Sequence, residues 1–330
     1  MEKTNQNLKF KLNIQQFADD DFAPAIEPED YVPNKIEDLA EMIGTIAEQT
    51  IREVSAEDKL AVFDKMPVDN GDTIEQAVVK MASPRAYDKT GANALTRKQP
   101  EIAVKLFKDW KRETYDTTVD ISLIRKVLKT GKGASDISTK LVASLGEGDK
   151  FTKYSRVKEL LKWGRQDKTG KVLKSLGTVP ATAEGINFKE VLVKIKDTIS
   201  GMQYVNADFN TANLPRRTNK EDIYLLMPYK LKNRMDVNEL ASVFNLEKDK
   251  IDAHIIELDI ETETIDGVEC YPIYVVDYWA ILDYTRLHDM ADQKNADGLF
   301  WNYFLHVERL YGISPLFDGA YFFVATEQNS

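Results

Sequence analysis

The sequence has one cysteine, three histidines and no long hydrophobic run in 330 residues. The single Cys270 excludes an internal disulfide and fits a reducing compartment, so we expect the protein to be made and assembled in a cytoplasm. Polar residues interrupt the apolar stretch 10–17, which therefore lacks the layout of a secretory signal. No run reaches the ~20 apolar residues of a membrane-spanning helix, so no membrane partner is predicted.

Signatures of catalysis or of metal binding are also scarce. His254, His288 and His306 each lack a second ligand at metal spacing, and Cys270 has no base nearby in the sequence. The loop 131–135 (Gly-Lys-Gly-Ala-Ser) lacks the first glycine of a phosphate loop and the Ser or Thr directly after the lysine. We predict no catalytic residue, no metal and no cofactor. An enzyme using the carboxylates of 259–263 is the weakest alternative.

Charge is distributed in blocks, although the whole chain carries a net charge of −10. Acidic residues dominate 19–58 and basic residues dominate 85–174. Such asymmetry suits contact between the acidic part of one subunit and the basic part of another, and two solvated faces that never meet fit equally well. A basic region can also bind nucleic acid, but the net charge argues against a dedicated binder. The candidate intersubunit residues are Asp19, Asp20, Glu27, Arg85, Arg97, Lys98, Lys111 and Arg112.

The N-terminal third of the chain contains few long apolar patterns. Three prolines and many acids in 1–33 predict an extended arm. Asn34, with Glu37 three residues later, predicts a helix start, and short helices are expected at 56–64 and 72–81. The pattern of residues 83–120 predicts an exposed, hairpin-like loop that ends in a β-rich stretch.

Helical and strand patterns alternate in the rest of the chain, which predicts a mixed α+β class. Helices are expected at 121–129, at 135–145 and, after a break at Gly146-Glu-Gly148, at 151–164 with Leu160 and Leu161 on its apolar stripe. A linker is predicted at 170–185. The clearest helix is 187–200, which begins at Asn187 and ends at Gly201. Further β-type runs are 223–226, 255–260, 271–276 and 299–310.

The run 299–310 is unusually rich in aromatic residues. Leu299, Trp301, Tyr303, Leu305 and Val307 alternate with Phe300, Asn302, Phe304 and His306. Both faces of the predicted strand are therefore largely apolar, which predicts a strand covered on both sides, either in a core or against another subunit. We expect Trp301, Tyr303 and Phe304 to belong to the structural core.

A second interpretation concerns residues 235–255, whose pattern has the rhythm of a helix-turn-helix DNA-binding element. Its candidate recognition helix would carry Glu247, Asp249 and Asp252 against Lys248 and Lys250, a poor charge balance for phosphate contact. Two short packed helices are the favoured interpretation. A DNA-binding regulator remains the alternative function at this point.

Four blocks of the sequence resemble the major capsid proteins of small short-tailed phages of the phi 29 type. The blocks are Phe10–Ala18; Phe107–Asp120 with Leu123–Leu128; Glu221–Pro228 with Met235–Leu246 and His254–Asp259; and Gly298–Val307. The resemblance implies the Hong Kong 97-type capsid fold, with an N-terminal arm, an extended loop, a peripheral domain that contains a spine helix, and an axial domain. It also implies no catalysis.

The resemblance assigns expected parts to the chain. These are an arm (1–33), an N-terminal helical segment (34–82), an extended loop (83–120), a peripheral domain (121–185) with its spine helix at 135–165, an axial domain (186–298), and a return strand with the C-terminus (299–330). The implied partners are copies of the chain in pentamers and hexamers, portal and scaffolding proteins, and packaged double-stranded DNA bound non-specifically. The implied location is the virion.

Overall fold

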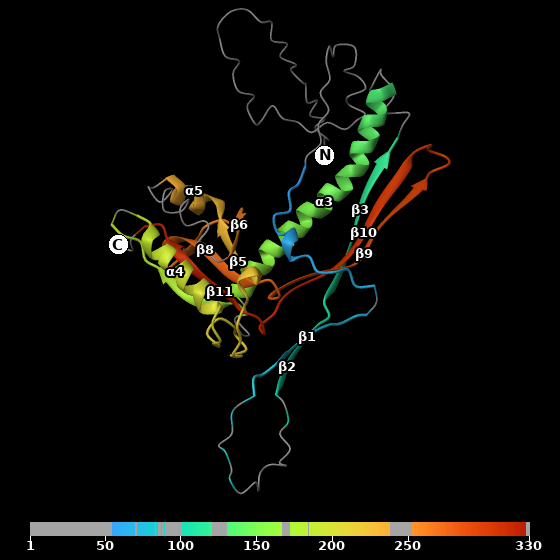
Figure 1. Ribbon diagram of the computed structural model, residues 1–330. Helices are drawn as coiled ribbons and strands as arrows, with labels where there is room; N and C mark the ends of the chain where they lie inside the picture. Colours follow the sequence, from blue (N-terminus) through green and yellow to red (C-terminus); the bar gives the residue numbers. More distant parts are fainter. Residues whose placement is uncertain are drawn as a thin grey trace, which may run out of the picture.

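The computed structural model describes residues 55–327, apart from 121–130, 167–171, 238–252, most of 83–100, and residues 70 and 184. Within these residues the protein combines three helices of at least nine residues with three β-sheets. The mixed α+β class is therefore confirmed. The long helix α3 runs from a lobe that holds the largest sheet to a narrow three-stranded sheet, and a hairpin projects away from both (Figure 1).

The largest sheet has the strand order β4-β11-β8-β5-β6, with β7 added on β8. One face packs against α4, and the other packs against the C-terminal half of α3 through Val157 and Leu161. This sandwich holds the two largest hydrophobic clusters. The bounds are β4 Lys174–Val179, β5 Ile223–Pro228, β6 His254–Leu258, β7 Glu263–Ile265, β8 Val268–Asp277 and β11 Gly319–Ala325, with α5 at Tyr229–Val237.

Helix α4 (Phe188–Met202) confirms the clearest helix prediction. The Asn187 side chain accepts a hydrogen bond from the Glu190 backbone N–H at 3.2 Å, which satisfies one of the free donors at the helix start. The apolar stripe from Val191 to Met202 is buried against the sheet. The helix continues through Gly201 rather than ending there, since Gly201 lies inside its last turn.

Helix α3 (Gly131–Gln166) is one continuous helix of 36 residues, so the predicted break at Gly146-Glu-Gly148 is wrong. Neither glycine has the positive φ that a break would use. Buried positions follow every four residues at Leu145, Asp149, Lys153, Val157 and Leu161. Two of these five are charged, so the buried stripe is only partly visible as a hydrophobic pattern.

The narrow sheet has the order β3-β10-β9, with β3 at Trp110–Val119, β9 at Ile281–Lys294 and β10 at Trp301–Ile313. The aromatic run is thus confirmed as a strand, and it is the central one. However, α3 covers only one face, where Leu305 and Val307 pack against Leu145. Phe304 and His306 on the other face are half-buried, so the single chain covers one face fully, and cover of the second face by another subunit stays a prediction.

The third sheet is a two-stranded hairpin of β1 (Ile74–Val79) and β2 (Ile102–Phe107). The helix predicted at 72–81 is therefore wrong, because this segment pairs as a strand with residues more than twenty positions later. The helix predicted at 56–64 is reduced to one 3-10 turn, η2 (Ala61–Phe63). The predicted helices at 34 and 121–129 lie outside the described residues.

Several strands pair across the boundaries expected from the sequence. β4 replaces the middle of the predicted 170–185 linker, because its backbone pairs in parallel with β11. β9 pairs with β10 in the narrow sheet, while β11 returns to the largest sheet beside β8. The helix-turn-helix interpretation of 235–255 is wrong at its end, since β6 begins at His254 and pairs with β5; residues 238–252 lie outside the described part.

Candidate assembly surface

The hairpin of β1 and β2 exposes an apolar face that nothing in the described chain covers. Ile102, Val104 and Leu106 alternate along β2 onto one face, and Val79 lies opposite Ile102. These four side chains are 49–65% exposed. A two-stranded ribbon is only marginally stable alone, and an exposed apolar patch is typical of an interaction surface. The hairpin therefore presents a binding surface without a core of its own.

Polar contacts fix the base of the hairpin to the narrow sheet. Arg286 on β9 donates to Asp72 at 2.7 Å and to both carboxylate oxygens of Glu308 at 2.6 and 3.1 Å. The Trp110 indole donates to the carbonyl of Asp72 at 3.0 Å, and the Arg286 guanidinium lies 4.6 Å from the Trp110 ring centroid. Gln76 donates to the carbonyl of Trp279 at 3.1 Å. The orientation of the hairpin is thus set at its root.

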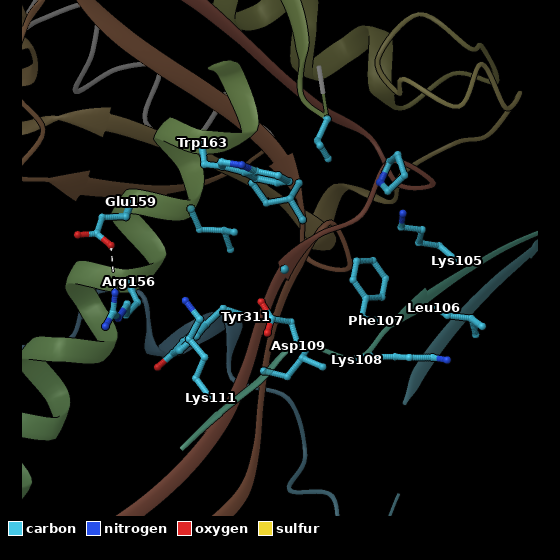
Figure 2. A pocket seen from close by; sticks show the side chains of 16 residues that line it. Lys105, Leu106, Phe107, Lys108, Asp109, Lys111, Arg156, Glu159, Trp163 and Tyr311 are labelled. Atoms are coloured by element: carbon cyan, nitrogen blue, oxygen red, sulfur yellow. Dashed lines mark ion pairs between the residues drawn. The ribbon is translucent and has the colours of Figure 1, made fainter. Parts of the chain in front are cut away.

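A groove of about 800 Å³ lies beside this base, between the start of β3, helix α3 and the end of β10 (Figure 2). Its walls include the apolar side chains of Phe107, Leu160, Trp163, Tyr311 and Ile313. Trp163 is half exposed, although it is among the largest side chains of the protein. An indole left in water at the wall of a groove is typical of a position that is buried on binding.

Basic residues line the rim of this groove. Lys105 comes from β2, Lys108 from the link between β2 and β3, Lys111 from β3, and Arg156 from α3. Arg156 pairs with Glu113 at 3.0 Å and with Glu159 at 3.5 Å, and these carboxylates hold its pKa above the ordinary value. The groove therefore combines apolar walls with an excess of positive charge, and it suits an acidic segment that also carries apolar residues.

The structure describes two of the predicted intersubunit residues. Lys111 and Arg112 are exposed on β3, where Lys111 also lines the groove. Arg112 lies opposite Glu308 of β10 and contributes to lowering its pKa, after the larger effect of Arg286. The remaining candidates lie outside the described residues; they are Asp19, Asp20, Glu27, Arg85, Arg97 and Lys98.

The predicted core residues differ in burial. Leu161 is fully buried on α3, and Leu160 is half-buried beside it. Tyr303 packs against the small cluster around Leu145 of α3. Trp301 and Phe304 are half-buried, and Trp301 stacks on Tyr303 with ring centroids 6.5 Å apart. Sequence patterns missed the polar contacts that join α3 to the narrow sheet, because ion pairs between distant segments leave no local signal.

The residues weighed for chemistry have structural partners. Glu263 accepts two hydrogen bonds from Arg165, at 2.9 and 2.7 Å, and Asp259 lies 3.4 Å from the Lys158 ammonium. Burial raises the pKa of the Cys270 thiol, as expected for an inert side chain. In the described part of the chain, no group of three or more His, Cys, Asp or Glu side chains is arranged to hold a metal ion. No described helix is long and apolar enough to span a membrane.

Solved phage capsids share this arrangement of helices and sheets. The capsid protein of Staphylococcus phage Andhra superposes with a TM-score of 0.67 at 13% identity, covering 86% of this chain and 88% of the phage chain. The capsid of cyanophage P-SCSP1u superposes with a TM-score of 0.56 at 11% identity, covering 94% of this chain and all of the other. The fold is therefore that of tailed-phage capsid proteins, the Hong Kong 97 type expected from the sequence.

Sequence comparison identifies the family within that class. The model of the Phi29-like phage major capsid protein family matches residues 4–323, and the chain belongs to this family. The major capsid protein of Bacillus phage GA-1 is 25% identical over 276 residues, and that of Streptococcus phage Cp-1 is 22% identical over 316 residues. The matches cover 82% and 91% of this chain. The chain spans 56% of the length of the GA-1 protein and 85% of the Cp-1 protein.

Proposed function

We propose that the protein is the major capsid subunit of a tailed bacteriophage and that its copies assemble, through pentamers and hexamers, into an icosahedral shell around double-stranded DNA. Family membership supports this function, and the uncovered apolar face of the hairpin is the structural observation that carries it. Four exposed apolar side chains on a projecting ribbon need a partner surface. A neighbouring copy supplies such a surface at every position of a closed shell.

The sheets support an assignment of the expected domains within the subunit. Helix α3 with the narrow sheet forms the peripheral domain, and the largest sheet with α4 forms the axial domain that meets its copies around the five- and six-fold axes. The hairpin corresponds to the extended loop and begins at Ile74 rather than at 83. Because β9 and β11 pair across the sequence boundaries, the two domains are built from interleaved segments.

The basic groove is the proposed binding site for the acidic N-terminal segment of a neighbouring copy. The segment 17–32 carries Asp19, Asp20 and Glu27 between apolar residues that include Phe17 and Phe22. This alternation of acids with aromatic residues matches apolar walls with a basic rim. Many such contacts closed by symmetry stabilise a shell even where each is weak.

Other partners follow from the same function. The shell encloses DNA and binds it without sequence preference, and it meets portal and scaffolding proteins during assembly. The net charge of −10 suits a container wall, since a strongly cationic wall would bind phosphate tightly and impede movement of the genome. The protein carries out no catalysis and resides in the virion.

The hairpin face gives the sharpest test of this function. Val104→Asp places a charge at the centre of the exposed face, at a side chain that is 50% exposed in the single chain. We expect the variant to fold with an unchanged circular dichroism spectrum and to form no shells by negative-stain electron microscopy. The matched control is Val104→Thr, which keeps the shape and the strand preference and should assemble. Normal shells from Val104→Asp would refute the role of this face.

A further inference from the structure

The segment that leads into the hairpin is anchored to β9 at a junction with α3. The Lys65 backbone N–H donates to the carbonyl of Asp283 at 2.8 Å, and the Val68 N–H donates to the carbonyl of Thr285 at 3.0 Å. Phe63, just before them, is fully buried. These contacts attach the chain at the junction, a few residues before the contacts of Asp72 at the hairpin base and the start of the hairpin at Ile74.

One buried ammonium group lies within ion-pair distance of three carboxylates at this junction. The Lys153 ammonium of α3 lies 3.1 Å from Asp58 and 3.9 Å from Asp283, and it contacts Asp64 directly. The side chains of Lys153, Asp58 and Asp283 are 9%, 6% and 1% exposed. One oxygen each of Asp58 and Asp283 has no hydrogen-bond partner. A buried carboxylate without full pairing is costly to ionise.

The Lys65 ammonium is a second buried positive charge, and it lies beside two aromatic rings. It donates to the carbonyl of Tyr278 at 2.7 Å and lies 3.0 Å from the Tyr278 ring centroid and 4.9 Å from that of Trp279. The side chain is buried, and a ring face with one carbonyl replaces little of the lost hydration. Burial lowers the pKa of Lys65 to about 7, against the opposing pull of Asp277, Asp283 and other carboxylates.

The Asp283 carboxyl changes charge in the same pH range. Burial raises its pKa to about 7, opposed mainly by Lys153 and reinforced by Asp64 and Asp58. Arg309 also faces it, but this guanidinium is held by both oxygens of Asp149. The groups around Asp283 and Lys65 are Asp58 and Asp64 from the entering segment, Lys153 from α3, Arg309 and Tyr311 from β10, Asp222 from the turn before β5, and Asp277 from β8.

We propose that this junction is a proton-operated latch, which holds the segment entering the hairpin least tightly near neutral pH and more tightly at either lower or higher pH. At low pH Asp283 carries a proton, so its buried carboxyl group is neutral and the Lys153 ammonium pairs with the carboxylates of Asp58 and Asp64. At high pH Lys65 is neutral and needs no hydration. Near neutrality both groups are charged for part of the time, and both charges are poorly solvated.

The direction for each group follows from linkage between protonation and folding. Asp283 has a folded-state pKa above its ordinary value of 3.8, so its contribution to local stability is lost as the pH rises from about 4 to about 7. Lys65 has a folded-state pKa below its ordinary value of 10.5, so its contribution is lost as the pH falls from 10.5 to about 7. The stabilising contributions of Asp283 and Lys65 are therefore both small near pH 7, where the local stability is lowest.

Amide hydrogen exchange of the full chain measures the latch directly, at one protein concentration and with the assembly state checked by light scattering. The reporting amides are those of Lys65 and Val68, corrected for intrinsic exchange rates. We expect protection about tenfold higher at pH 5 and at pH 9 than at pH 7, since each unit of pKa difference between the open and closed states changes the opening equilibrium about tenfold.

Two variants separate the acid limb of the protection profile, the rise from pH 7 to pH 5, from its alkaline limb, the rise from pH 7 to pH 9. Asp283→Asn should abolish the rise in protection on the acid side and keep the alkaline rise, whereas Lys65→Met should do the reverse. Asp64→Asn, at a more exposed position, should move the acid limb to lower pH, because it removes a neighbouring negative charge. This milder variant keeps the test valid if Asp283→Asn does not fold.

The matched control is Asp289→Asn, an exposed aspartate on the same strand, which should leave the profile unchanged. Protection that is flat with pH in the unaltered chain would overturn the proposal. So would an acid limb that is unaffected by both Asp283→Asn and Asp64→Asn. The measurement concerns the chain itself, so its failure would leave the proposed capsid function standing, and a failure of shell assembly would leave the latch standing.

Discussion

Arg309 on β10 binds Asp149 on α3 through both oxygens of the carboxylate. One hydrogen bond measures 2.8 Å, the other oxygen is also in contact, and both side chains are at most 10% exposed. Arg309 also donates to Thr285 of β9 at 3.2 Å. Two residues 160 positions apart thus join the helix to the central and edge strands of the narrow sheet.

Removing one partner of this pair should destabilise the subunit strongly. Asp149→Ala leaves the buried Arg309 guanidinium without its hydrogen-bonded carboxylate, and we expect a loss of ~3–5 kcal/mol in the free energy of unfolding. Urea denaturation followed by circular dichroism measures this loss. The double variant Asp149→Leu with Arg309→Met removes both charges and should recover most of the stability. Equal losses in the single and double variants would show that the ion pair is not the cause.

The two ends of strand β10 should respond differently to truncation. Leu305 is 1% exposed against α3, so Leu305→Ala should cost ~2–5 kcal/mol through lost burial and a cavity. Trp301 is half-buried, with Tyr303 and the Lys294 ammonium near its ring, so Trp301→Ala should cost clearly less. The comparison uses the midpoint of urea unfolding. A larger loss at Trp301 would contradict the one-sided burial of the strand.

Two glycines should give opposite results when replaced by alanine. Gly146 lies within α3, and an added methyl group meets nothing within 4 Å, so Gly146→Ala should stabilise the subunit by ~0.5–1 kcal/mol. At Gly312 an added methyl group would lie 3.1 Å from the Phe107 ring at the hairpin base. Gly312→Ala should therefore destabilise by ~1–3 kcal/mol. Thermal unfolding would check both, and destabilisation by Gly146→Ala would favour a break in α3.

Charge reversal in the groove tests the proposed binding site for the acidic segment. Changing Lys108 and Lys111 to Glu should slow or prevent shell assembly while leaving the unfolding transition unchanged, because both side chains line the groove rim. The defect should be partly relieved by reversing Asp19 and Asp20 to Lys in the same chain. Light scattering follows assembly at low and moderate salt, since salt screens such contacts. Assembly of the Lys108 and Lys111 variant at the normal rate would argue against this binding site.

Sequence patterns predicted the elements whose signals are local. Helix α4 was found because Asn187 caps it and its apolar stripe is regular, and β10 was found because its aromatic residues alternate. β9 was not found, since seven consecutive residues at its end are exposed and polar or small apart from Met290. The sequence does not predict β1 as a strand, because its partner lies more than twenty residues away. Pairing at that range is decided by tertiary context.

The candidate surface was only partly predictable. Block charges fit a partner surface and two solvated faces equally well, and the structure places the basic residue Lys111 on a groove rim. The apolar walls of that groove come from β2, α3 and β10, so no local window contains them. The buried charges Asp149 and Lys153 broke the hydrophobic stripe of α3, and this concealed both the continuity of the helix and its ion pairs.

A density map of heads assembled from this chain, together with the other head proteins of its phage, tests the central claim most directly. The account predicts a closed icosahedral shell of pentamers and hexamers in which Val79, Ile102, Val104 and Leu106 of each copy lie within van der Waals contact of a neighbouring copy. Heads in which this face of the hairpin is exposed to solvent, or heads whose shell lacks this chain, would contradict it.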